Sequence, residues 1–406
     1  MTDFSRAEAA HRAGLDEAYL DRLVDLGLLV PGAGDRFTKF DIRKAQMLHT
    51  LEGAGMPPDG VAEGLRSAAM SLAFLESPVY ERFATFSDDT FRTLSQRTGL
   101  PLELVLLIRE AAGGAMPRPD DRVREDEALV IPYVRVALAM GYTPRSVERT
   151  LRVLGDSLRR VAATESDAWQ SDIMARYLAR PGGVAELTSL ASEEPTLQQD
   201  DATDQALLAL WHAHQAQAWT GNIITGFESV MTDAGLLTNP TTRPPAICFL
   251  DITGYTRLTY ERGDAAAAQL ATDLNRLVSR SALEHAGRPV KWLGDGVMVY
   301  FNDPGLGVIA ALDMVEGVSG VDLPPAHVGL HAGPVLFQEG DYFGRTVNMA
   351  ARIAEYARPG EVLVTREVVD SADAASAQGV AFREIGPVEL KGIEVAVTLH
   401  AAERAR

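Results

Sequence analysis

The chain has 406 residues, of which 46% are hydrophobic and 23% are charged, and its formal net charge is −18. This length allows two or three domains, and the composition is typical of a soluble globular protein. The acidic charge argues against general affinity for nucleic acid or anionic lipid, because phosphate groups would repel the protein. The net negative charge is still compatible with a local basic pocket that binds one phosphate ligand.

Three patterns bear on the cell compartment. No uninterrupted apolar run reaches about 18 residues, so no membrane span is expected. The first residues, MTDFSRAEAAHRAG, contain no apolar signal-peptide core. The single cysteine, Cys248, excludes an internal disulfide and fits a reducing environment. Together these patterns predict a cytoplasmic protein.

Residues 1–70 predict short helices, a PGAGD turn, an extended RFTKFD segment and a further helix, IRKAQMLHTLEGAG. This order resembles a MerR-type winged helix-turn-helix. Residues 1–60, however, carry seven Lys or Arg and ten Asp or Glu. We therefore expect a winged-helix shape that contacts protein, and nucleic acid is not an expected partner. Four acids fall on or beside the would-be recognition helix, where DNA phosphates would repel them: Asp16, Glu17, Asp21 and Asp25.

Residues 71–184 predict more helices, with Leu, Ala, Val and Met at spacings of three and four. An apolar mouth between the helices of residues 60–110 could take a lipid or another small ligand, although the sequence reveals none.

Residues 185–242 predict an acidic linker over 187–204 and then a connecting helix over about 205–236, which ends before the prolines of TNPTTRPP. His212 and His214 of this helix are candidate pH-sensitive groups, although most histidines in such a place only face solvent.

Residues 243–406 predict alternating strands and helices. AICFLDI is a buried strand, and PVKWLGDGVMVYF reads as a hairpin with GDG at its tip. AHVGLHAGPVLFQ is a second strand pair or one long strand, and GRTVNMAARIAEYA is a helix. The opening β-α-β-β-α-β order is ferredoxin-like, with further strands at the C-terminal end. The expected fold class is α+β, with an all-helical N-terminal half.

Two carboxylates stand at predicted strand ends. Asp251 closes one strand and Asp295 lies in the hairpin turn, so a sheet that places these strands side by side brings both carboxylates to one edge. Mg²⁺ is typically held by one or two carboxylates together with water and substrate phosphate. The residues after Asp251, namely Thr253, Gly254 and Tyr255, lead into a helix and could cradle a phosphate with backbone N–H groups. Taken singly, an Asp in a hairpin turn is more often structural.

Asn348 and Arg352 lie four positions apart on a predicted helix and so face the same way. Such a pair alone is most often a solvated helix face.

The ordered set of FLDITGYT, KWLGD and DYFGRTVNMAARI resembles the catalytic domain of class III nucleotidyl cyclases, the adenylyl and guanylyl cyclases. The resemblance covers about residues 244–403. It extends to soluble actinobacterial cyclases in which a helical N-terminal domain regulates the C-terminal one, some of them inhibited at neutral pH and relieved by acid.

The resemblance implies a role for each matching residue. Asp251 and Asp295 match the two metal-binding aspartates, with the Ile252 carbonyl as an extra ligand for two divalent cations, Mg²⁺ or Mn²⁺. Lys291 and Asp341 match the pair that reads adenine, and a Lys donor with a carboxylate acceptor suits that ring.

Further positions match the family's phosphate and transition-state residues. Asn348 would position the ribose, and Arg352 would neutralise charge on the α-phosphate. Lys391 matches a lysine that contacts the terminal phosphates. Where many relatives have a phosphate-holding Arg, this chain has His327, which could substitute for it when protonated or could merely fill space.

The implied reaction converts ATP into cyclic AMP and pyrophosphate in a homodimer whose two sites each draw residues from both chains. Guanylyl cyclases commonly carry Glu and Cys at the positions of Lys291 and Asp341, so a guanylate or dual-specificity enzyme is the second hypothesis. A DNA-binding regulator with a nucleotide-sensing domain is the third. We expect residues 1–184 to regulate the catalytic domain, most simply by inhibition, with the connecting helix as a two-state element.

Overall fold

The structure is a computed structural model, which describes residues 3–67, 71–76, 80, 84–180, 182–183, 186–187, 194–237, 244–320, 323–372 and 377–405. The chain forms two compact units, Met1–Trp219 and Thr220–Arg406, and the division falls within the long helix α12 (Glu194–Asp233). The boundaries expected at residues 70, 184 and 242 are finer than this division and stay predictions.

Four helices build the first part of unit 1 around their own hydrophobic core, in which Leu23 and Phe37 are fully buried. Thr38 ends the short extended segment and caps α3, since its hydroxyl accepts the Asp41 N–H while the Asp41 carboxylate accepts the Thr38 N–H. The helices are α1 (Arg6–Ala13), α2 (Glu17–Asp25), α3 (Lys39–Gly53) and α4 (Pro58–Arg66), followed by the 3₁₀ turn η1 (Ala73–Glu76).

The second part of unit 1 has a separate core and is helical as predicted, with one addition. β1 (Phe86–Thr90) and β2 (Arg122–Arg124) form a two-stranded antiparallel sheet. Beside it the buried Glu127 carboxylate accepts from Arg109 Nε at 2.6 Å. The helices are α5 (Phe91–Thr98), α6 (Leu102–Ala111), α7 (Glu125–Ala128), α8 (Ile131–Ala139), α9 (Pro144–Ala168), the π-helical turn η3 (Trp169–Met174) and α10 (Ala175–Leu178).

The acidic stretch expected to be a linker is instead helical from residue 194, because α12 starts about eleven residues before the expected start of the connecting helix. Asp, Glu, Gln and Ala are compatible with a helix, and acidic residues are favoured near a helix N-terminus by the helix dipole. Polarity alone therefore did not distinguish an exposed helix from a linker.

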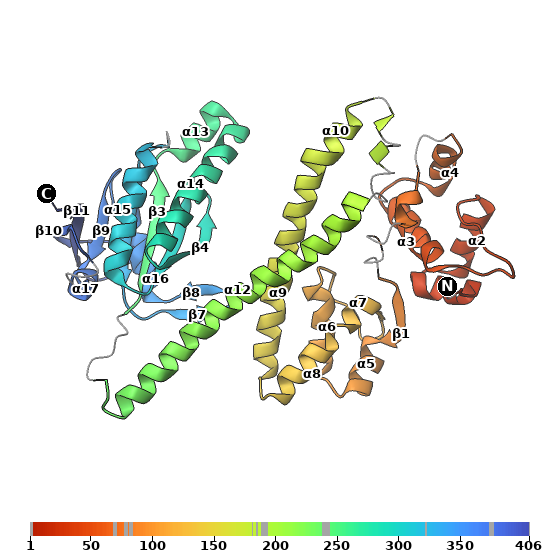
Figure 1. The fold of residues 1–406 in the computed structure, drawn as a ribbon, viewed down its shortest axis with the longest axis horizontal. Coiled ribbons are helices and arrows are strands. Elements are labelled where there is room, and N and C mark those ends of the chain that lie inside the picture. The colour runs from red at the N-terminus through yellow and green to blue at the C-terminus, as the bar shows by residue number, and fades with distance from the viewer. Residues whose placement is uncertain are drawn as a thin grey trace. The chain divides into compact units, whose positions relative to one another are not determined.

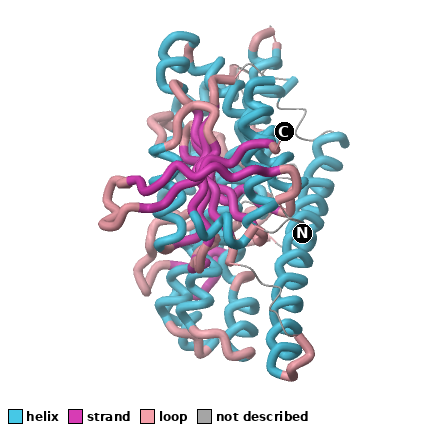
Figure 2. The backbone as a smooth tube through the Cα atoms, turned by 90° about the vertical axis from the view of Figure 1, so that its left-hand side faces the viewer, coloured by secondary structure: helices cyan, strands magenta, loops and turns pink. Residues whose placement is uncertain are grey.

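Unit 2 contains a seven-stranded sheet in the order β10-β11-β9-β6-β3-β5-β4. Its β6-β3-β5-β4 part is the ferredoxin-like arrangement expected from the sequence, and the last three strands extend it. The strands fan out with a strong twist when the sheet is viewed as in Figure 2. They are β3 (Ala246–Ile252), β4 (Gly287–Leu293), β5 (Gly296–Phe301), β6 (Ala326–Ala332), β9 (Val362–Thr365), β10 (Val380–Val388) and β11 (Val397–Arg404).

Helices cover both faces of this sheet (Figure 1). Side chains of α14 and α15 form the main core with one face, whereas α16 packs on the other, where Val347 and Ala350 meet Ile247. Gly329 of β6 permits the close approach of α16, because a Cβ there would lie 2.2 Å from the Ala354 nitrogen. The helices are α13 (Tyr255–Arg262), α14 (Asp264–Glu284), α15 (Pro304–Gly320), α16 (Arg345–Tyr356) and α17 (Arg366–Ser371).

The segment AHVGLHAGPVLFQ divides into two strands that pair with different partners. β6 joins the main sheet, and β7 (Leu336–Gln338) forms a small hairpin with β8 (Asp341–Phe343). Among the described residues, no helix is both long and apolar enough to cross a membrane.

Candidate active site

The two predicted metal carboxylates lie at one end of neighbouring strands. Asp251 is opposite Gly296 in the β3–β5 ladder, and Asp295 immediately precedes Gly296 in the turn between β4 and β5. This confirms the expectation that the two strands adjoin. A hollow of about 530 Å³ adjoins the turn, lined by Trp292, Gly294 and residues of α14.

The charges at this sheet end favour a cation. Burial and the negative charge of Asp295 both raise the pKa of the Asp251 carboxyl, whereas His327 acts in the opposite direction. A divalent cation between the carboxylates would relieve this repulsion, so the donors present fit the implied metal. Within the described part of the chain, no group of three or more His, Cys, Asp or Glu side chains is arranged to hold a metal ion. A cation held here by Asp251 and Asp295 therefore completes its ligand set with other oxygens, from backbone carbonyls and water, and from substrate when it is bound.

His327 faces Asp251 across the ladder that joins β3 and β6. Its Nε2 lies 3.7 Å from Asp251 Oδ2, and its Nδ1 lies 3.2 Å from the Thr253 hydroxyl. The imidazole is 13% exposed, so it is mostly buried.

The predicted base-reading pair is formed within one chain. Lys291 of β4 donates to Asp341 Oδ2 at the start of β8, at 2.5 Å. The other oxygen of Asp341 accepts the Tyr342 N–H at 2.8 Å, which fixes the carboxylate. The Phe343 ring lies under the same ammonium, 5.9 Å from it, and is half exposed. A cation, a carboxylate and an exposed aromatic ring therefore stand together beside the sheet edge formed by β4.

α16 carries the predicted transition-state pair on its accessible side. Its buried face includes Thr346, Val347 and Ile353, while Asn348 is exposed and Arg352 is partly exposed one turn later. Arg352 is not free, because its Nη1 donates to both carboxylate oxygens of Glu355, at 2.6 and 2.7 Å.

The remaining predicted metal and substrate residues differ in exposure. Gly254, with a φ of +78°, is the N-cap residue of α13, and Thr253 before it is exposed. The Tyr255 hydroxyl instead donates to the Ala267 carbonyl at 2.8 Å and ties α13 to α14. Ile252 is buried, and Lys391 lies exposed between β10 and β11.

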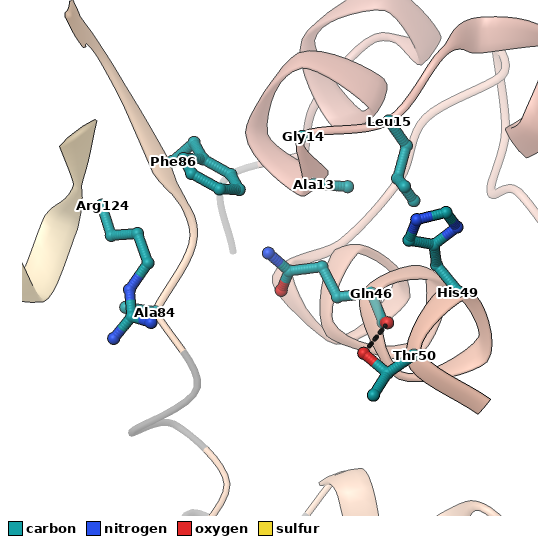
Figure 3. Close-up of a pocket in the computed structure, with 9 residues that line it drawn as sticks. All are labelled: Ala13, Gly14, Leu15, Gln46, His49, Thr50, Ala84, Phe86 and Arg124. Carbon is teal, nitrogen blue, oxygen red and sulfur yellow. Dashed lines mark hydrogen bonds between the residues drawn. The ribbon is translucent and has the colours of Figure 1, made fainter. Parts of the chain in front are cut away.

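The regulatory candidates of unit 1 lie in different settings. His212 and His214 are exposed on α12, and the ring of His212 lies against Trp211. The pocket in Figure 3, of about 620 Å³, is bordered by the end of α1, by α3 and by the small sheet, with Gln46, His49, Phe86 and Arg124 among its lining residues. Most of these residues precede the 60–110 region in which we expected an apolar mouth, and the lining is polar as well as apolar.

Two protein-family models match this chain. Residues 238–401 match the model of the adenylate and guanylate cyclase catalytic domain. The chain carries a class III cyclase catalytic domain. Residues 60–200 match the adenylate cyclase regulatory domain, so the two parts occur together in this chain. All the predicted metal, substrate and transition-state residues fall inside the cyclase match.

Similar proteins carry cyclase names. A pH-sensitive adenylate cyclase of Mycobacterium tuberculosis, MT1302, is 28% identical over 327 residues, which is 77% of each chain. An adenylate cyclase of Streptomyces coelicolor is 25% identical over 339 residues, 79% of this chain and 81% of that one. The solved adenylyl cyclase CyaB of P. aeruginosa is 24% identical, covers 41% of this chain and 96% of its own, and has a TM-score of 0.35.

Two features of the site were missed from the sequence. Glu355 follows Arg352 by three residues on one helix, a spacing that could have suggested the ion pair. The contact between Thr253 and His327 spans 74 residues and depends on the register of β3 and β6, for which the sequence gives no signal.

Proposed function

We propose that the protein is an adenylate cyclase that converts ATP into 3′,5′-cyclic AMP and pyrophosphate. The observation that carries the proposal is the pair of carboxylates, Asp251 and Asp295, at adjoining ends of β3 and β5 within a cyclase domain. The Lys291–Asp341 pair supports ATP over GTP, because the ammonium can donate to a ring nitrogen and the carboxylate can accept from the exocyclic amine.

In the reaction, the ribose 3′-oxygen attacks the α-phosphorus while pyrophosphate leaves. Asn348 positions the ribose, and Arg352 neutralises the charge that builds on the α-phosphate once it exchanges Glu355 for the substrate. Lys391 and the backbone of residues 253–255 hold the outer phosphates. Two divalent cations held by Asp251, Asp295 and the Ile252 carbonyl would acidify the attacking hydroxyl and balance phosphate charge. The chain itself chiefly orients substrate and supplies fixed charges.

A homodimer with composite sites is part of the proposal. Exposed apolar side chains support it, since large exposed patches mark interaction surfaces. Trp219, Ile223, Phe227 and Val230 of α12 follow one helix face at spacings of four, four and three, and each is more than half exposed. Leu336 and Phe337 of the β7–β8 hairpin are also exposed. Asn348 and Arg352 lie on an accessible helix face, which leaves them able to act on a nucleotide held by a second chain.

Regulation by residues 1–184 is the second part of the proposal, supported by the match to a regulatory domain. α12 contributes residues to both compact units, so a conformational change in this helix would also alter the unit that contains the catalytic domain. We propose inhibition at neutral pH, with His212 and His214 as candidate sensors. A small ligand of unit 1 is an alternative signal.

The experiment is cyclase activity with ATP and GTP, in Mg²⁺ or Mn²⁺, from pH 5.5 to 8.5, with an Asp295→Asn variant as the matched inactive control. Cyclic AMP formation by the wild type alone supports the proposal. Formation of cyclic GMP at an equal rate would favour the dual-specificity alternative. Inactivity with both nucleotides, in protein confirmed to be dimeric, would refute it.

A further inference from the structure

The environment of His327 argues against direct contact between its imidazole and a substrate phosphate. A side chain that binds phosphate should reach into the open site, but this imidazole is 13% exposed, with one nitrogen within hydrogen-bond distance of Thr253 and the other facing Asp251. The Thr253 hydroxyl lies at Nδ1 and the Asp251 carboxylate at Nε2, 3.2 and 3.7 Å away. Turning the ring toward a phosphate would break its contacts with Thr253 and Asp251.

The backbone fixes the three residues in this arrangement. Asp251 and His327 are direct partners in an antiparallel ladder, so their side chains emerge on the same face of the sheet. The Thr253 N–H donates to the Pro325 carbonyl at 3.0 Å, which holds Thr253 beside the start of β6. In the neutral tautomer that accepts the Thr253 hydroxyl at Nδ1, the ring proton is on Nε2, the nitrogen that lies 3.7 Å from the Asp251 carboxylate.

We propose that His327 is a positioning residue for the Asp251 carboxylate, held in place by Thr253, and that it sets the affinity of this sheet end for a divalent cation. The inference rests on the proposed function in that Asp251 is taken as a metal ligand. Loss of a side chain that orients a metal-ligating carboxylate typically lowers the metal affinity by about 10- to 100-fold.

The test is a titration of the full chain with Mn²⁺ in the absence of nucleotide. The electron paramagnetic resonance signal of the free ion measures how much Mn²⁺ remains unbound. His327→Leu removes both nitrogens and should weaken Mn²⁺ binding by about tenfold or more. His327→Gln keeps a donor near Nε2 and should restore most of the affinity. Thr253→Val, an exposed and structurally mild change, should weaken binding by about threefold, in the same direction.

His331 supplies a matched control on the same strand. Its Nδ1 lies 2.8 Å from the Thr365 hydroxyl and 3.8 Å from a Glu367 oxygen, a similar environment remote from Asp251. His331→Leu should leave Mn²⁺ affinity within about twofold of wild type. An equal loss in both Leu variants would mean general damage to β6 and would overturn the proposal.

A kinetic comparison separates the two roles of His327. At saturating Mn²⁺, His327→Leu should change the KM for ATP less than about twofold, because the ring does not contact phosphate. Unchanged Mn²⁺ affinity together with a raised KM would establish the phosphate role instead. If wild type binds Mn²⁺ but forms no cyclic nucleotide, the proposed function fails, while the Mn²⁺ affinities still decide the role of His327.

Discussion

Substitution of Asp341 tests how the enzyme chooses its base. In Asp341→Asn, the amide oxygen can still accept the Tyr342 N–H, so the backbone contact at 2.8 Å survives. The other oxygen, which accepts from Lys291, becomes an NH₂ group that cannot accept from the ammonium or from an adenine amine. One hydrogen bond to a charged group is worth about 1.5–3 kcal/mol, or roughly 10- to 150-fold.

We therefore expect kcat/KM for ATP to fall by roughly 10- to 150-fold, while kcat/KM for GTP stays level or rises. Initial rates with each nucleotide at saturating Mn²⁺ give both values. Asp370→Asn is the matched control, because that carboxylate also pairs with a cationic side chain, the guanidinium of Arg366 at 2.8 Å, but lies on α17 away from the site. An equal fall for ATP and GTP would refute the assignment of Asp341 to base recognition.

Three further predictions concern neighbouring groups. Glu355→Gln should free Arg352 and raise kcat/KM for ATP by up to about fivefold, since an exposed ion pair is worth at most about 1 kcal/mol; a lower value would show that Glu355 holds Arg352 in its productive position. The pKa of Asp251 is raised above 3.8, so its charge destabilises the metal-free fold at neutral pH. Thermal melts in EDTA should find Asp251→Asn more stable than wild type at pH 8, with the difference vanishing below about pH 4, and no difference at pH 8 would contradict this. Tyr255→Phe should lower stability by about 1 kcal/mol in urea melts, through loss of the bond to Ala267, and leave the KM for ATP unchanged; a raised KM would give the hydroxyl a substrate role.

Local patterns were sufficient to predict the strands and the helix that carry the candidate site residues. The strand that carries Asp251 next to its last residue begins as a continuous apolar run, and the GDG tip marks the hairpin that carries Asp295. A sheet that pairs these strands places both carboxylates at one end. The i, i+4 spacing of Asn348 and Arg352 likewise became one accessible face of α16.

Features that depend on tertiary contacts were not predictable from single segments. The acidic residues before 205 read as a linker, although α12 continues through them. The small sheet of unit 1 joins strands about 35 residues apart, and neither strand has a strong alternating pattern of its own. The role of His327 depends on which residue of β3 lies opposite it, and a register shift of one residue would have turned the ring to the other face.

The composite active site is the central claim, and mixed dimers test it most directly. Asp251→Asn and Arg352→Ala chains should each be inactive alone. When equal amounts are co-expressed, random pairing makes half of the dimers mixed, and each mixed dimer has one intact site of two, so activity should return to about a quarter of wild type. No recovery, in mixed dimers verified by two affinity tags, would contradict a site shared between chains.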